Sequence, residues 1–295
     1  KPEHAKKLAE LAVQDTGLGN VPDKIIKKQR KTFGALRDLL RVKSVGEIER
    51  DDKKGIVKFA KPMGVVGAIT PSTNPGATPV NKALLALKGR NAIIVAPSPL
   101  GYRTTELVVN FMRDALTQIG LPADLVQILP SPVTKESTQA LMEAVDLVVV
   151  TGSQDNVRRA YRSGTPAIGV GAGNVPVIID ETADLDAAAE KIRDSKIFDN
   201  ATSCSSENAV VIVDAVYDQA IEALKRAGGY LANAEQKAKI QSELWKNGKL
   251  NRHLIARGMD VLVNGFELPA EVASSKFIMT EETGIGREYP LSGEK

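Results

Sequence analysis

Short runs of apolar residues alternate with helix-length segments from Val65 to Ile179, and this alternation limits the fold more than any other feature of the chain. Continuous apolar runs are typical of parallel strands that helices cover on both faces. The predicted strands are Gly64–Thr70, Ala92–Ala96, Val126–Leu129, Leu147–Val150 and Val177–Ile179, and the predicted helices are Asn81–Lys88, Thr104–Ile119 and Lys135–Glu143. The sequence therefore predicts an α/β fold, and such sheets bind ligands beyond the carboxyl ends of their strands.

The length of 295 residues predicts two domains, assigned to residues 1–177 and 178–295. The first 50 residues have helical spacing. Strand-like segments follow at Val45–Glu49 and Gly55–Ala60, and a second α/β unit is predicted from Asp184–Arg193, Ala209–Val213 and Val216–Ala227. Periodicity is weak after Leu250, and the chain starts without Met. We therefore expect a second domain that is incomplete at its C-terminal end, in a chain that begins inside a longer protein.

Charge and composition exclude several classes of function. The 39 Lys and Arg residues are interspersed with 36 Asp and Glu residues, whereas a nucleic-acid-binding protein shows a concentrated basic face. The small basic cluster of Lys27, Lys28, Arg30 and Lys31 is interpreted as a solvated helix face, or at most as a binding place for an anionic ligand. One cysteine and two histidines exclude a Cys-rich zinc site and an HExxH site. We expect neither a metal nor a nucleic-acid partner.

The chain also carries no sign of membrane insertion or export. No apolar run approaches the roughly 18 residues of a membrane span, and the N-terminal segment has no apolar signal region. A single cysteine cannot form an internal disulfide, which fits a reducing compartment. A cytoplasmic location without membrane contact is expected.

Cys204 is the strongest candidate for chemistry. A lone cysteine is often a small buried apolar residue, but Cys204 lies in the polar run Thr-Ser-Cys-Ser-Ser-Glu-Asn, directly before an apolar strand. A thiol in such a loop is expected to be accessible to a substrate. No histidine lies close in the sequence. Backbone dipoles or a bound cofactor would have to activate this nucleophile.

Three further polar loops are candidates, and the first two directly follow predicted strands and have two interpretations each. Thr70–Pro75 is either a ligand-binding edge or an ordinary turn. Thr151–Ser153 fits a phosphate or ribose contact, or a helix N-cap. Gly169–Asn174 lacks the GxGxxG pattern, and by itself it indicates only a close approach to the backbone.

Together these segments resemble the aldehyde dehydrogenase superfamily. The motifs Thr-Pro-Ser-Thr-Asn-Pro, Pro-Ala-Ile-Gly-Val-Gly-Ala-Gly-Asn and Val-Ile-Ile-Asp-Glu-Thr-Ala-Asp look like its CoA-acylating branch, and the resemblance covers nearly the whole chain. Ser44–Asp51, Pro132–Lys135 and Ala201–Asn208 look most like acylating sulfoacetaldehyde dehydrogenases. The resemblance implies a Rossmann-type cofactor-binding domain at residues 1–177 and a catalytic domain, truncated at its C-terminus, at residues 178–295.

The resemblance also implies roles for individual residues. Cys204 falls at the nucleophile, and the oxyanion donor falls at Thr73 by alignment on the two prolines, although Asn74 is the better donor chemically. The implied cofactor-binding residues are Thr70, Pro71, Ser72, Ser98, Pro99, Thr134, Thr151, Gly152, Ser153, Gly171, Ala172, Gly173 and Glu294. Candidate contacts for the substrate's sulfonate are Asn200, Thr202, Ser203 and Ser205, among which the sequence does not choose.

Two departures from relatives narrow the chemistry that the resemblance implies. Val170 stands where hydrolytic relatives have a glutamate base, so a thioester on Cys204 would wait for coenzyme A rather than water. Pro99 stands where NAD-selective relatives often have a glutamate, and with Ser98 and Arg103 nearby this leaves room for NADP. We expect NADP or NAD as cofactor and coenzyme A as co-substrate.

Other functions stay open at this point. An acylating acetaldehyde or propionaldehyde dehydrogenase, a hydrolytic aldehyde dehydrogenase and a glutamyl-phosphate reductase-like enzyme share this layout. From a different class, the chain could be a non-catalytic assembly module, since the superfamily associates through a projecting β-hairpin. The resemblance implies a homo-oligomer, either a dimer or a tetramer.

Overall fold

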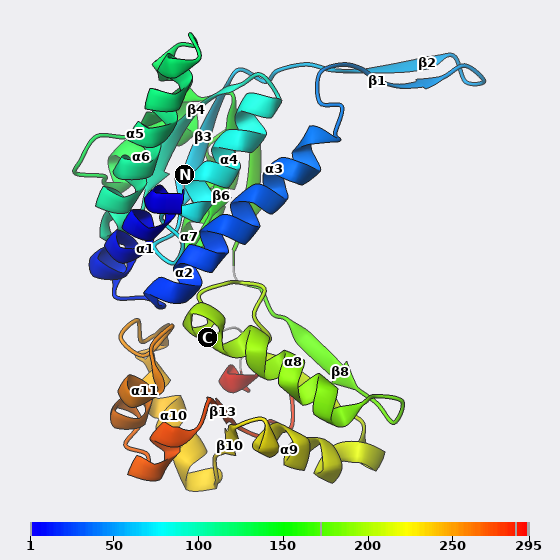
Figure 1. Cartoon of the computed structure of the whole chain (residues 1–295), viewed down its shortest axis with the longest axis vertical. Coiled ribbons are helices and arrows are strands. Elements are labelled where there is room, and N and C mark those ends of the chain that lie inside the picture. The colour runs from blue at the N-terminus through cyan, green and yellow to red at the C-terminus, as the bar shows by residue number, and fades with distance from the viewer. Residues whose placement is uncertain (1, 172, 287, 294–295) are drawn as a thin grey trace. The chain divides into compact units, whose positions relative to one another are not determined.

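The computed structural model describes residues 2–171, 173–286 and 288–293. The chain consists of two compact units (Figure 1). Unit 1 comprises Lys1–Gly17 and Val21–Ala172. Unit 2 comprises Leu18–Asn20 and Gly173–Lys295. The apolar pattern sets the boundary after residue 177, slightly further along the chain, and it does not set Leu18–Asn20 apart from their neighbours.

Unit 1 is built on a five-stranded sheet in which every neighbouring pair is parallel. The strand order is β5-β4-β3-β6-β7. The strands are β3 (Val65–Thr70), β4 (Ala92–Pro97), β5 (Val126–Ile128), β6 (Leu147–Thr151) and β7 (Ala167–Val170). The predicted α/β fold is confirmed, and β7 is a strand that the apolar pattern does not identify.

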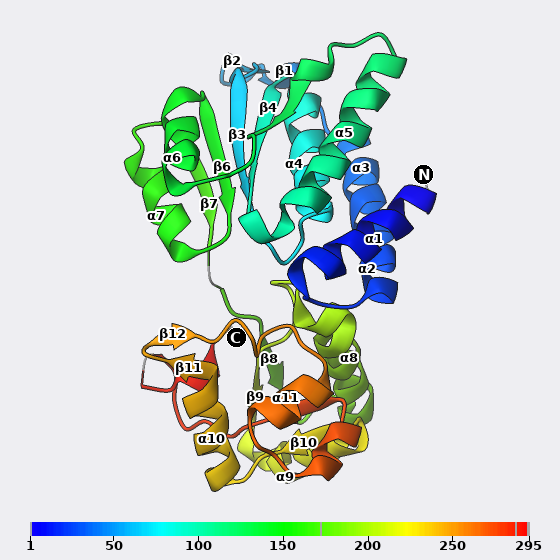
Figure 2. The ribbon, with the colours of Figure 1, turned by 90° about the vertical axis from the view of Figure 1, so that its left-hand side faces the viewer.

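Helices cover both faces of this sheet, as the continuous apolar strands require. The four helices that follow strands are α4 (Ala77–Lys88), α5 (Tyr102–Gln118), α6 (Lys135–Ala144) and α7 (Gln154–Arg162). Figure 2 shows α4 and α5 on one side of the sheet and α6 and α7 on the other. Ile93 and Val95 pack among residues of α4 and α5, whereas Val148 and Val150 pack among residues of α6 and α7.

The N-terminal part of unit 1 is helical and ends in a hairpin. Its elements are α1 (Pro2–Thr16), α2 (Val21–Lys27), a π-helical turn (Lys28–Thr32), α3 (Phe33–Leu40), β1 (Gly46–Asp51) and β2 (Ile56–Ala60). The antiparallel β1–β2 hairpin extends away from the sheet of its own unit (Figure 1). Lys27, predicted to lie on a solvated face, is instead buried at 5% exposure.

Unit 2 contains three two-stranded sheets among its helices. Its strands are β8 (Pro176–Ile179), β9 (Ala209–Ile212), β10 (Gly229–Leu231), β11 (Trp245–Lys246), β12 (Lys249–Leu250) and β13 (Phe277–Met279). Its helices are α8 (Leu185–Ile197), α9 (Tyr217–Arg226), α10 (Ala234–Leu244) and α11 (Met259–Gly265). The predicted α/β unit after residue 178 is present as β8, α8, β9 and α9, with β8 and β9 paired in parallel.

Helices that could cross a membrane are absent from the described ranges, since none of them combines sufficient length with sufficient hydropathy.

Candidate functional site

The loops of unit 1 that carry candidate residues all lie at one edge of its sheet. Because the five strands are parallel, their carboxyl ends share that edge. Thr70, Thr151 and Val170 end β3, β6 and β7, and Ser98 directly follows β4. The topology thus gathers at one edge the loops that the sequence selects one by one.

The strand order reverses between β3 and β6, which is the place where open α/β sheets bind their ligands. Thr70 ends β3 there with 3% of its surface exposed, and its hydroxyl oxygen has no hydrogen-bond partner among the described residues. A buried hydroxyl without a partner is costly unless a ligand satisfies it. The end of β3 therefore fits the polar groups of a dinucleotide cofactor.

Two of the candidate cofactor residues are also helix caps. The Thr134 hydroxyl accepts a hydrogen bond from the Ser137 N–H at 3.1 Å at the start of α6, and the Ser153 hydroxyl accepts one from the Asn156 N–H at 3.3 Å at the start of α7. The capping interpretation of Ser153 is thereby confirmed. It does not exclude ligand binding, because helix N-termini attract phosphate groups.

The glycine loop after β7 is only partly described. A Cβ atom added at Gly171 would lie 2.7 Å from the Gln154 side chain, so this position has no room for a larger residue beside α7. Gly173 is exposed and has open space where a Cβ would lie. Ala172 and Glu294, both predicted to contact the cofactor, lie outside the described residues.

The segment after β4 bears on the choice between NAD and NADP. The Ser98 N–H donates to the Thr70 carbonyl oxygen at 3.1 Å, and Pro99 is exposed. The Arg103 guanidinium pairs with Asp15 at 3.4 Å while its side chain stays 63% exposed. A 2′-phosphate would therefore compete with Asp15 for this arginine.

The loop between β3 and α4 is fixed by contacts along its length. The Thr105 hydroxyl donates to the Pro75 carbonyl oxygen at 3.0 Å, and Thr105 is fully buried. The Thr78 N–H donates to the Asn74 carbonyl oxygen at 3.2 Å. A Cβ at Gly101 would lie 2.6 Å from Pro75, so the α5 side approaches closely. Thr73 and Asn74 are half-buried in this rigid loop.

Cys204 is exposed in unit 2, which excludes the interpretation of a buried apolar residue. It lies on a turn that is closed by the Ser206 N–H donating to the Ser203 carbonyl oxygen at 3.0 Å. Ser205 is exposed beside it, and Ser206 is buried at 3% exposure beneath the turn. The thiol is therefore accessible to a substrate, as nucleophilic catalysis requires.

The backbone before this turn is left-handed over three successive non-glycine residues. The φ angles are 52° at Asp199, 49° at Asn200 and 56° at Ala201. Each such residue costs free energy, about 1–2 kcal/mol for a residue such as alanine. Left-handed strain is found at functional sites where the surroundings hold it in place.

Asp199 supplies part of that hold, and sequence reasoning missed it. It is fully buried, and its carboxylate accepts hydrogen bonds from the Asn20 N–H at 2.9 Å and the Thr202 hydroxyl at 2.5 Å. All three residues belong to unit 2. Asp199 lies five residues before Cys204. Nothing in the sequence distinguishes it from an exposed aspartate at the end of a helix.

The four candidate sulfonate contacts have different surroundings. Ser203 and Ser205 flank Cys204 on the turn, and both are at least partly exposed. Thr202 is buried at 6% exposure, and its hydroxyl donates to Asp199 rather than to solvent. Asn200 lines a different pocket of about 190 Å³, whose wall is mainly apolar and includes Leu254 and Phe277. The serines are therefore the better candidates.

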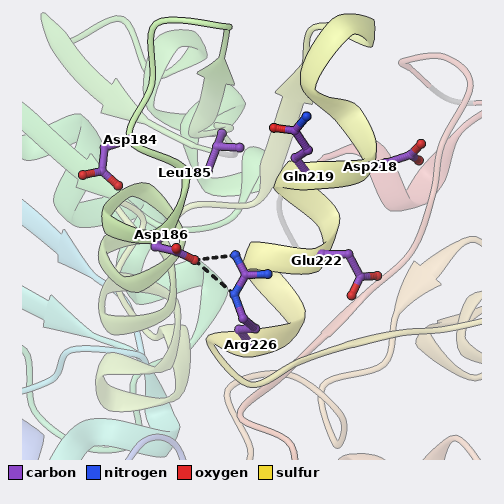
Figure 3. A pocket seen from close by; sticks show the side chains of 7 residues that line it. All are labelled: Asp184, Leu185, Asp186, Asp218, Gln219, Glu222 and Arg226. Atoms are coloured by element: carbon purple, nitrogen blue, oxygen red, sulfur yellow. Dashed lines mark hydrogen bonds and ion pairs between the residues drawn. The ribbon is translucent and has the colours of Figure 1, made fainter.

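A second hollow on unit 2, of about 500 Å³, lies between α8 and α9 (Figure 3). Its charged lining includes Asp186, whose carboxylate pairs with Arg226 at 2.6 Å, and the acids Asp218 and Glu222. None of the candidate site residues lines it. We assign it no role in the chemistry.

The profile of the aldehyde dehydrogenase family matches residues 2–239, and the chain belongs to this family. It is 52% identical over 297 aligned positions to the acylating sulfoacetaldehyde dehydrogenase of Cupriavidus necator, covering 100% of this chain and 60% of that protein. The structure resembles an acetylating aldehyde dehydrogenase from Geobacillus thermoglucosidasius with a TM-score of 0.88 and 37% identity, covering 98% of this chain and 64% of that one.

An engineered glycolyl-CoA reductase with bound NADP⁺ is similar too, with a TM-score of 0.82 and 29% identity over 97% of this chain and 64% of that chain. The chain thus spans about three fifths of the curated relative, at 60% of its length. The predicted resemblance to the aldehyde dehydrogenase superfamily is confirmed by the family profile, and the relatives named here, to which the chain is similar, are acylating or CoA-linked enzymes.

Proposed function

We propose that the full-length protein carrying this sequence is a CoA-acylating aldehyde dehydrogenase that oxidises sulfoacetaldehyde to sulfoacetyl-CoA. The exposed turn bearing Cys204, with Asp199 buried beneath it, is the observation that carries the proposal. The similarity to an acylating sulfoacetaldehyde dehydrogenase at 52% identity supports the choice of substrate.

The chemistry begins at the thiolate of Cys204, which forms a bond to the aldehyde carbon. The resulting oxyanion is held by a side-chain amide, assigned by the resemblance to the Thr73–Asn74 pair, and by the Cys204 N–H. Removing one such donor typically lowers kcat about 10²–10³-fold. Asn74 can offer an amide N–H to an oxyanion, and this favours it over Thr73.

A bound nicotinamide cofactor would supply the acceptor for the hydride that leaves the aldehyde carbon. Cys204 then carries the acyl group as a thioester. The thiol of coenzyme A attacks the acyl carbon and loses its proton, and Cys204 departs as a thiolate. Val170, 53% exposed at the end of β7, offers no base to activate water in competition. The acyl group therefore passes to coenzyme A.

Cofactor binding is assigned to the carboxyl edge of the unit 1 sheet. The hydroxyl of Thr70 and the N-termini of α6 and α7 supply donors suited to a pyrophosphate. The similarity to the engineered reductase with bound NADP⁺ supports NADP as the cofactor, and NAD is the alternative. Ser203 and Ser205 are the residues assigned to the sulfonate.

A homo-oligomer is part of this proposal. The β1–β2 hairpin exposes Ile48, Ile56 and Phe59, at 42%, 49% and 60%, and so carries an apolar surface on a projecting element. Pairing of such hairpins between copies would cover these side chains. We further assign the protein to the cytoplasm, in keeping with its lone thiol.

The decisive experiment follows reduction of NADP and of NAD by the full-length protein. The aldehydes are sulfoacetaldehyde, acetaldehyde and propionaldehyde, each with and without coenzyme A, and Cys204→Ala is the test variant. We expect turnover that requires coenzyme A, yields the acyl-CoA and falls at least about 10⁴-fold in the variant. Lys225→Ala, an exposed change on α9, serves as the matched control with unchanged turnover.

Each remaining outcome selects an alternative. Faster turnover of acetaldehyde or propionaldehyde would move the assignment to that substrate. Turnover unaffected by coenzyme A would identify a hydrolytic enzyme. A folded protein without turnover, whose Cys204 resists alkylation, would support an assembly module instead.

A further inference from the structure

Two lysines of α2 are buried against the loop that carries Thr73 and Asn74. Lys24 is 2% exposed and Lys27 is 5% exposed, and both belong to unit 1 together with the loop. A buried ammonium group is unfavourable unless it donates hydrogen bonds. The two lysines meet that requirement at adjacent residues of the loop.

The two ammonium groups bind different atoms. Lys27 Nζ donates to the side-chain oxygen of Asn74, Oδ1, at 3.0 Å. Lys24 Nζ lies 3.5 Å from the backbone carbonyl oxygen of Thr73, at the long end of the hydrogen-bond range. Lys27 therefore acts on a side chain that is assigned to the chemistry.

An ammonium group has donors and no acceptor, so it fixes which end of a carboxamide faces it. If the Asn74 amide turned over, its NH₂ group would meet the Lys27 ammonium, and two donors would oppose each other. The oxygen must face Lys27, and the NH₂ group must lie at the other end of the planar amide. The contact thus determines the direction of the Asn74 N–H donors chemically.

Other hydrogen bonds fix the backbone on which the Asn74 amide is carried. The Pro75 carbonyl is bound by Thr105 and the Asn74 carbonyl by Thr78, so the backbone is already fixed. These bonds restrain the main chain and not the rotation of the Asn74 amide. Lys27 restrains that rotation.

We propose that Lys27 is a positioning residue that holds the Asn74 amide with its NH₂ group directed as an oxyanion donor. This inference rests on the proposed function, because the oxyanion belongs to that reaction. It also selects Asn74 over Thr73, since the lysine pair binds the side chain of Asn74 and only the backbone of Thr73.

The test is a double-mutant cycle in the full-length protein, with CoA-dependent oxidation of the aldehyde that the wild-type protein turns over fastest. The variants are Lys27→Met, Asn74→Ala and the double variant, and Lys24→Met is the matched control on the same helix. Methionine keeps the buried stem and removes the donor. Alkylation of Cys204, mapped by peptide, and thermal unfolding check that each variant is folded.

We expect Asn74→Ala to lower kcat about 10²–10³-fold. Lys27→Met should lower kcat about tenfold, a smaller loss because the amide remains and part of its population keeps the correct direction. The KM for the aldehyde should change less than about threefold, since the interaction forms in the transition state. In the Asn74→Ala background, Lys27→Met should lower kcat less than about twofold, because its target is gone.

An unchanged kcat in Lys27→Met, or equal losses in both backgrounds, would overturn the inference. So would an equal effect of Lys24→Met, because the contact of that lysine with the loop is to the backbone carbonyl oxygen of Thr73. If Lys27→Met unfolds, Lys27→Arg keeps a donor and must retain more activity than Lys27→Gln. Wild-type activity in Asn74→Ala would instead remove Asn74 from the proposed reaction while leaving the requirement for Cys204 intact.

Discussion

The two candidate loops are held in place in different ways. In unit 1, the Thr70–Pro75 loop extends from the central strand of a five-stranded parallel sheet, and its backbone is bound to α5 through Thr105. In unit 2, the turn bearing Cys204 follows a left-handed segment and leads into a sheet of only two described strands. Topology places the first loop, whereas one buried carboxylate and strained backbone hold the second.

This difference shows where each loop is vulnerable. A sheet distributes the positioning of its edge over many contacts, so a single substitution moves the backbone of that edge little. The Cys204 turn depends strongly on Asp199, which accepts hydrogen bonds from Asn20 and Thr202. Apart from Asn74 itself and Lys27, we therefore expect larger effects of single substitutions beside Cys204 than at the sheet edge.

Asp199→Ala should have the largest effect. The substitution removes hydrogen bonds from the half-buried Asn20 N–H and from the buried Thr202 hydroxyl, and each buried donor that is left unsatisfied costs about 1–3 kcal/mol. We expect the free energy of unfolding of unit 2 to fall by about 3 kcal/mol and CoA-dependent turnover to fall at least about 100-fold, since a misplaced nucleophile loses its geometry. Urea unfolding and steady-state kinetics measure the two losses.

Asp194→Ala is the matched control, because Asp194 lies on α8 close to Asp199 in sequence but is 67% exposed in its pair with Arg193. It should change stability by less than about 1 kcal/mol. The loss of stability in Asp199→Asn should lie between those of the two alanine variants, since its amide oxygen can still accept a hydrogen bond from the Asn20 N–H. Equal stability of Asp199→Ala and Asp194→Ala would refute the role of the carboxylate.

Lys82, on helix α4 beside the unit 1 sheet, offers a contrasting test. Its Nζ donates to the Val149 carbonyl oxygen at 3.0 Å, and burial lowers the pKa of Lys82 from 10.5 to about 8. The unfolded chain therefore binds more protons between these two values, and the free energy of unfolding rises with pH across that window. Below pH 8 the full cost of the buried charge is present.

Lys82→Met removes that cost and should raise the free energy of unfolding at pH 7 by about 2 kcal/mol. The gain should shrink as the pH rises from 8 toward 10.5, and urea unfolding at several pH values measures it. Lys88→Met on the same helix is the control, with no such pH-dependent gain. A gain that grows with pH would contradict the assigned cause.

Ala201→Gly should have the smallest effect, and a favourable one. Ala201 has a φ of 56°, a region that glycine adopts without strain. We expect stabilisation by about 0.5 kcal/mol, the difference between relieved strain and the greater freedom of glycine when unfolded. The control Ala188→Gly lies inside α8 and should destabilise by about 1 kcal/mol. Destabilisation in both variants would show that the left-handed segment is not strained.

Much of the fold could be predicted because the buried strands are apolar in sequence. β3, β4, β5 and β6 are continuous apolar runs, and their predicted positions agree with the structure. β7 escapes because Gly169 interrupts its apolar pattern, and a Cβ there would lie 2.8 Å from Val157. The helix α7 is also absent from the predicted elements; only Val157 and Ala160 of it are buried, although its polar and apolar residues are strongly segregated.

Those candidate residues whose neighbours in the sequence mark them could be predicted. The charged residues that the fold buries could not. Cys204 is identifiable from its polar neighbours, and its exposure agrees. Asp199 and Lys27 are not identifiable, because charged residues are mostly exposed and are therefore expected on the surface. Their roles arise from contacts with residues distant in sequence, Asn20 and Asn74, which periodicity does not register.

The assignment of Leu18–Asn20 to unit 2 decides how the protein can be dissected. A fragment beginning at residue 173 would lack Asn20 and its N–H donor to Asp199, and also Gly19, whose N–H donates to the Ala256 carbonyl oxygen at 3.1 Å. Cleavage after residue 172 would leave Leu18–Asn20, which belong to unit 2, on the N-terminal piece. The unit that carries Cys204 is thus discontinuous in the sequence, and a version of it made alone would need the missing tripeptide, supplied by circular permutation or as a separate peptide.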